Sequence, residues 1–97
     1  MPKVELKQVV SEKSSSRCYE ACQHMVEKAG YKIFKKRDIA SLLICEGTLA
    51  EKPVNLTVMI PFGNPTHVII NLSGDQLDEI ALNSEGARLF ALLQNEL

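Results

Sequence analysis

The sequence predicts an α+β fold, a two-layer sandwich in which two helices cover one face of an antiparallel sheet of four to five strands. The stretch Pro53–Leu72 alternates apolar and polar residues on both sides of a turn rich in proline and glycine, which is typical of two paired strands. The segments 14–29 and 84–97 carry apolar residues at helical spacing. The expected order is β-α-β-β-β-β-α, in a single domain over residues 1–97.

The N-terminal stretch Lys3–Val10 alternates apolar and charged residues, which suits a strand at a sheet edge. A mobile tail over residues 1–13 is the alternative, since chain termini are often poorly held. A polar turn at Ser11–Ser16 should follow, and a serine at 14, 15 or 16 can cap a helix that runs to about Ala29. Gly30 stands where a left-handed residue commonly ends a helix.

Two strands are expected next, at Tyr31–Arg37 and at Ala40–Thr48. The second contains four consecutive apolar residues, from Leu42 to Cys45. A continuous apolar run of strand length indicates a strand that is buried on both faces.

The central hairpin predicts its own register. A five-residue loop at Pro61–Pro65 would pair Val58 with Val68 and Leu56 with Ile70, so that the large aliphatic residues share one face. The opposite face of the hairpin, which we call the outer face, is then mixed rather than polar. It carries Asn55, Thr57, Met59, His67, Ile69 and Asn71.

Two helical pieces are expected at the C-terminal end, a short one at Asp75–Leu82 and a longer one at Ser84–Leu97. Their apolar residues would fall on opposite sides of one straight helix. We therefore expect a break at Asn83-Ser84.

Composition limits the classes of function. The net charge of −1 argues against a nucleic-acid or membrane partner, although residues 1–37 sum to +5 and residues 38–97 to −6. Three cysteines and the lack of an apolar leader in MPKVELKQVV predict a cytoplasmic protein. The helix–three-strand–helix order is similar to that of double-stranded-RNA-binding domains. However, the region that would contact phosphates, Asp75–Glu85, is acidic, so we expect no nucleic acid.

Catalytic patterns are missing from the sequence, and we expect neither an enzyme nor a bound cofactor. Cys18 and Cys22 lie four residues apart on one predicted helix, which allows a thiol or soft-metal site. The favoured interpretation is that both thiols pack in the core, where cysteine is common. His24 and His67 have no obvious partner for acid–base chemistry.

The mixed outer face is the candidate functional surface. It is expected to include five residues in particular: Leu43, Cys45, Thr57, Met59 and Ile69. A large exposed apolar patch marks an interface or a ligand site. We expect a small interaction module that self-associates, most simply as a homodimer, or binds a protein partner. The alternatives are a small apolar ligand held with help from Thr57, His67 and Asn71, or a sheet face that is simply wet.

Overall fold

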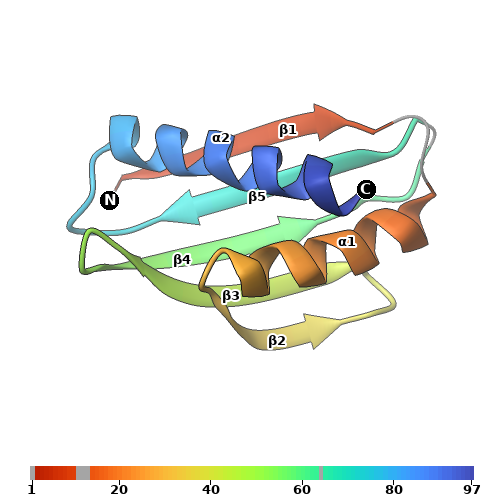
Figure 1. Cartoon of the computed structure of the whole chain (residues 1–97), viewed down its shortest axis with the longest axis horizontal. Helices are drawn as coiled ribbons and strands as arrows, with labels where there is room; N and C mark the ends of the chain where they lie inside the picture. Colours follow the sequence, from red (N-terminus) through yellow and green to blue (C-terminus); the bar gives the residue numbers. More distant parts are fainter. Residues whose placement is uncertain (1, 11–13, 64) are drawn as a thin grey trace.

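A computed structural model describes residues 2–10, 14–63 and 65–97 of the chain. Its elements follow the predicted order (Figure 1): β1 (Lys3–Val9), α1 (Ser15–Lys28), β2 (Lys32–Arg37), β3 (Leu42–Leu49), β4 (Lys52–Met59), β5 (His67–Ser73) and α2 (Glu79–Glu96). Part of the expected turn at Ser11–Ser16, and one residue of the expected hairpin loop, lie outside the described residues.

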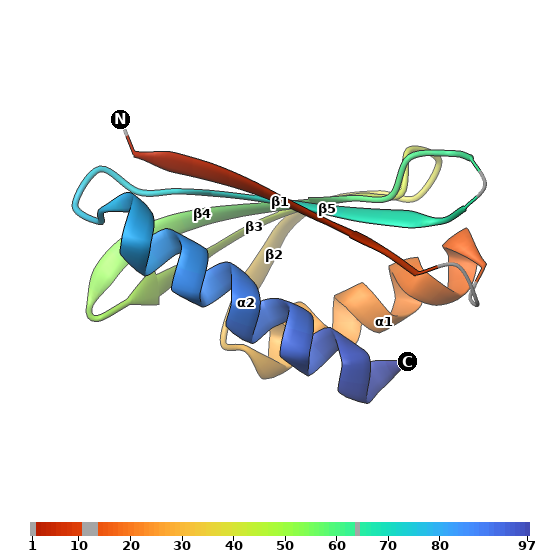
Figure 2. The same ribbon diagram turned by 90° about the horizontal axis from the view of Figure 1, so that it is seen from above.

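The five strands form one antiparallel sheet in the order β1-β5-β4-β3-β2. Helix α1 carries the chain from β1 at one edge to β2 at the other, and the remaining strands return as a meander. Both helices lie on the same side of the sheet (Figure 2), so the predicted two-layer α+β sandwich is confirmed. Strand β1 is the edge strand that its alternating charges predicted.

The ends of α1 are set by local signals in the sequence. The Ser14 side chain accepts a hydrogen bond of 3.2 Å from the Arg17 amide, which satisfies one of the free amides of the first turn. Gly30 follows the helix with a φ of 94°, a left-handed conformation that costs glycine little. Between these ends the helix buries the predicted apolar stripe, which includes Cys18, Cys22, Met25 and Val26.

Helix α2 is a single helix, and the predicted break at Asn83-Ser84 is wrong. Asp78 caps it, with a hydrogen bond of 2.7 Å from the Ala81 amide to the Asp78 side chain. The apolar residues of the expected first piece do not require a separate buried side of the helix. Leu77 lies before the helix, and Ile80 is 78% exposed. The buried stripe runs without interruption along the helix: Leu82, Glu85, Gly86, Leu89 and Leu93.

The register of the β4–β5 hairpin also differs from the prediction. Val58 pairs with Ile70 and Leu56 with Leu72, a shift of two residues, so the connection is longer than five residues. The ends of this connection form hydrogen bonds to other segments. The Ile60 amide donates to the Ser41 carbonyl at 3.0 Å, and the Thr66 carbonyl accepts from the Val10 amide at 2.7 Å. Because the shift is even, every side chain of the hairpin keeps its predicted face.

Candidate interaction face

The outer face of the sheet, opposite the helices, carries apolar residues between two basic edges. Its composition follows from the strand pairing, because directly opposed residues share a face. One complete row crosses all five strands, from β1 to β2: Lys7, Ile69, Met59, Leu42 and Arg37. In the next row an apolar residue again lies beside a basic residue of β2, because Ile44 is paired with Lys35 on one side and with Thr57 on the other. We call the four residues Leu42, Ile44, Met59 and Ile69 the apolar stripe.

Three of the five predicted face residues lie where they were expected. Thr57, Met59 and Ile69 belong to the outer face, and Met59 is the most exposed of them. Ile69 is largely covered by its neighbours. The aliphatic stem of the paired Lys7 can shield part of it while the ammonium group stays in water.

The placement predicted for Leu43 and Cys45 is wrong. They pair with Val58 and Leu56, and all four side chains are buried beneath the helices. Their neighbours Leu42 and Ile44 take the outer positions and are only half-buried. In a run of four apolar residues the alternation gives no indication of which pair faces out, so only the pairing with β4 decides it. The expectation that β3 is fully buried on both faces is therefore also wrong.

Charge is divided between the two layers of the molecule. Among the described residues, the outer face has five basic and two acidic side chains, a net charge of +3: Lys3, Lys7, Lys32, Lys35, Arg37, Glu5 and Glu46. The helix layer, including the Asp78 cap, has three basic and six acidic residues, a net charge of −3. The net charge of the chain is therefore close to zero although one side of the molecule is positive and the other is negative.

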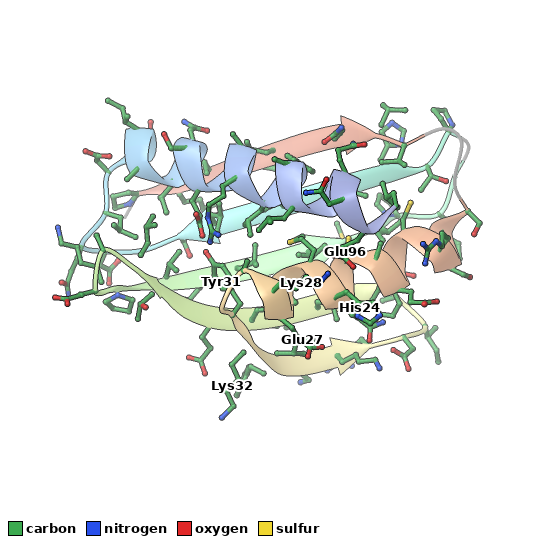
Figure 3. The ribbon with its side chains drawn as sticks, in the orientation of Figure 1. His24, Glu27, Lys28, Tyr31, Lys32 and Glu96 are labelled. Carbon is green, nitrogen blue, oxygen red and sulfur yellow. The ribbon has the colours of Figure 1, made fainter. Side chains whose placement is uncertain are left out.

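An ion pair between the helices and a cluster around a buried carboxylate help to hold the negative layer together. Lys28 and Glu96 point toward one another across α1 and α2 (Figure 3), with 2.6 Å between Nζ and Oε2. Deeper in the same layer, the Tyr31 hydroxyl donates to Glu85 at 2.6 Å. Arg88 donates to both carboxylate oxygens of Glu85, at 2.7 and 2.8 Å. These contacts make four charged residues of this layer part of the helix packing: Lys28, Glu85, Arg88 and Glu96.

The three thiols are buried in the core. Cys18 and Cys22 lie on the covered face of α1, and Cys45 lies on the covered face of β3. Burial raises the pKa of the Cys22 thiol to about 12 and that of Cys45 to about 11. A raised pKa removes the thiolate that metal binding and thiol exchange both need. Over residues 2–10, 14–63 and 65–97, no three His, Cys, Asp or Glu side chains are grouped as metal ligands would be.

A shallow depression of about 240 Å³ lies on the outer face beyond the apolar stripe. Five of its six lining residues are polar: Lys3, Asn55, Thr57, Asn71 and Ser73, with Leu72 the sixth. It brings together two of the three polar residues that the sequence suggested for a ligand site, Thr57 and Asn71. The third, His67, lies on the same face near the other end of β5, opposite Val9.

The fold and this face define the class of the protein, a two-layer α+β sandwich with one uncovered, basic-rimmed sheet face. No protein-family model matches the sequence, and no curated protein matches it either. In the part of the chain that the structure describes, neither α1 nor α2 combines the length and apolar character that crossing a bilayer requires.

Proposed function

We propose that the chain is a small, non-enzymatic interaction module whose outer sheet face binds an acidic protein surface. One observation carries the proposal, the cross-strand row in which Ile69, Met59 and Leu42 lie between Lys7 and Arg37. Interfaces commonly have an apolar centre within a polar rim. The cations at the two ends of this row make the rim positively charged. A positive rim favours carboxylates on the partner.

The same charges argue against a twofold dimer through this face. Two copies packed face to face would bring two surfaces of net charge +3 together, which costs free energy unless the opposed groups are paired. The positive face could instead meet the negative helix layer of a second copy. That contact is heterologous, so it would give closed rings or open filaments rather than a twofold dimer. A different protein with an acidic surface is the partner that the charges favour.

Selection from a displayed library of helical peptides tests this proposal. We expect the peptides enriched on the immobilised chain to carry Asp or Glu around a few aliphatic residues. The double substitution Lys7→Glu and Arg37→Glu should weaken their binding about tenfold or more, because each reversal turns an attraction into a repulsion. Met59→Lys should weaken binding as well, since it places a charge in the apolar centre.

Lys52→Glu is the matched control. It makes the charge change of one of these two reversals at an exposed position on β4, at the opposite end of that strand from Met59, and should leave peptide binding unchanged. Peptides that tolerate the double reversal, or that carry no acidic residues, would refute the proposal. Light scattering that gives the monomer mass at all micromolar concentrations is the expected companion result. A stable dimer disrupted by Met59→Lys would identify a second copy as the partner instead.

The polar depression supports a second candidate, a site for a small polar ligand. Amide and hydroxyl groups beside the Lys3 ammonium suit a small carboxylate. Titration with acetate and succinate, followed by the side-chain amide signals of Asn55 and Asn71 in NMR spectra, tests it. Saturable shifts that Lys3→Gln removes would support this site, and unchanged signals at millimolar concentrations would exclude it.

A further inference from the structure

Two large apolar side chains at one end of the molecule are almost fully exposed. Ile39 in the β2–β3 turn is 92% exposed and Phe62 in the β4–β5 loop is 83% exposed. They are the two most exposed large apolar side chains among the described residues. Single exposed apolar residues are common, but two on adjoining loops form a feature that calls for a partner.

These two loops are fixed beside one another. The Ile60 amide donates to the Ser41 carbonyl at 3.0 Å and so joins the start of one loop to the end of the other. The β2–β3 turn is also anchored from below, because the Tyr19 hydroxyl on α1 donates to Asp38 at 2.9 Å. Both loops curl toward the side of the sheet that the helices leave open (Figure 2). The two side chains therefore belong to segments that project from the positive side of the molecule.

Basic residues surround the base of this projection. Lys35 and Arg37 lie on the outer face of β2 directly before the β2–β3 turn, and both are exposed. Lys7 lies at the other end of the row that contains Arg37. The acidic residue of the turn, Asp38, is occupied by Tyr19 and by an ion pair of 3.8 Å with Lys36. The negative helix layer lies on the far side of the sheet (Figure 2).

We infer that Ile39 and Phe62 dock the chain on an anionic lipid surface, with the end of the molecule that carries these two loops turned toward the bilayer. Apolar side chains on projecting loops can enter the headgroup region without needing a complementary pocket, whereas a protein partner must supply one. The surrounding Lys and Arg side chains would then lie at the level of anionic headgroups. The net charge of the chain predicts no such partner, but it averages a positive side with a negative one.

Fluorescence gives a direct test, because the sequence contains no tryptophan. Phe62→Trp places a single reporter at the loop tip. Vesicles of phosphatidylcholine with about 30 mol% phosphatidylserine should shift its emission to the blue and should sediment with the protein. Both effects should fall with added salt, and vesicles of phosphatidylcholine alone should give much weaker binding. Ile80→Trp is the matched control, because Ile80 is a comparably exposed residue on the helix layer; its emission should not change.

The double variant Ile39→Ser and Phe62→Ser measures how much these two side chains contribute to vesicle binding. It should lower partitioning onto the anionic vesicles about tenfold or more, whereas Ile80→Ser should leave it unchanged. Absent binding to these vesicles, or binding that the double variant retains, would overturn the inference. A blue shift of Phe62→Trp that grows with protein concentration without vesicles would do the same, since it would mark a protein contact. The double variant should still bind the acidic peptides of the preceding section, so the two proposals can fail separately.

Discussion

The Tyr31 hydroxyl donates a hydrogen bond of 2.6 Å to Glu85 and joins the start of β2 to the middle of α2 beneath the sheet. Glu85 is only 3% exposed, and it is the buried carboxylate of the helix layer. Arg88 completes the cluster, and it also donates to the Ala29 carbonyl at the end of α1. A single buried carboxylate thus ties together both helices and an edge strand.

Removing the Tyr31 hydroxyl should destabilise the fold measurably. In Tyr31→Phe, the buried Glu85 carboxylate loses one of its donors, and hydrogen bonds to charged groups contribute about 1.5–3 kcal/mol. We expect the free energy of unfolding in urea to fall by about that amount. Tyr19→Phe is the matched control. Its hydroxyl bonds to the exposed Asp38, so its loss should cost about 1 kcal/mol or less. Equal losses in the two variants would contradict this account.

The Glu85 carboxylate should also make stability depend on pH in the acid range. Burial alone raises its pKa, but hydrogen bonds from Arg88 and then Tyr31 outweigh burial and lower the pKa below the usual range. A carboxyl with a depressed pKa stabilises the fold fully above its unfolded value of about 4.3. That stabilisation is lost as the pH falls below this value and through the lower pKa of the folded state. The free energy of unfolding in urea, measured from neutral pH down to about pH 3, should therefore decline more steeply in the unsubstituted protein than in Glu85→Gln. Parallel declines would exclude this role.

Gly47 gives the Tyr31 ring the room that it occupies. A Cβ atom at position 47 would lie 2.8 Å from Cδ2 and 3.1 Å from Cε2 of the ring, closer than carbon atoms approach. The ring cannot easily move, because its hydroxyl is bound to Glu85. We expect Gly47→Ala to cost about 1–3 kcal/mol of stability through overpacking. In a Tyr31→Ala background the same substitution should cost much less, and a double-mutant cycle measures the difference. Additive effects would show that the close approach has no energetic consequence.

The thiols should be inert in the folded protein. Burial, together with the neighbouring Cys18 and Cys45 thiols, raises the pKa of Cys22, so a thiolate scarcely forms near neutral pH. We expect Ellman's reagent to label the native chain very slowly at pH 8 and to label all three cysteines at once in guanidinium chloride. Rapid labelling of Cys18 or Cys22 in the folded protein would revive the thiol or soft-metal hypothesis.

Local signals in the sequence predict much of this fold. The Ser14 cap and Gly30 bound α1 within a residue or two, because each acts through a hydrogen bond or a φ angle of its own segment. The hairpin faces were also predictable, since an even error in register leaves every face unchanged. The sequence pattern does not predict α2 as a single helix, because it counts Ile80 as a residue that needs burial, whereas Ile80 is exposed.

The candidate face was less predictable, because it is a property of pairing between distant segments. Lys7 and Arg37 are thirty positions apart in the sequence, and only the strand order places them at the two ends of one row. Charge counted along the chain divides it into a basic and an acidic half. Folding then places this charge on the two layers. Helix α1 is neutral, because Arg17 and Lys28 balance its two glutamates, so the negative charge of the helix layer comes from α2 and its Asp78 cap.

Adjacent residues in β3 provide a direct test of which face is uncovered. Leu43 is fully buried against the helices, so Leu43→Ala should cost about 2–5 kcal/mol in the free energy of unfolding. Ile44 is half-buried on the outer face, so Ile44→Ala should cost clearly less, although the two side chains are of equal size. The two substitutions should have the reverse order of effect on the acidic peptides, because only Ile44 lies on the face that binds them. If Leu43→Ala were the milder change, β3 would be paired one residue out of this register, and the row between Lys7 and Arg37 would not exist.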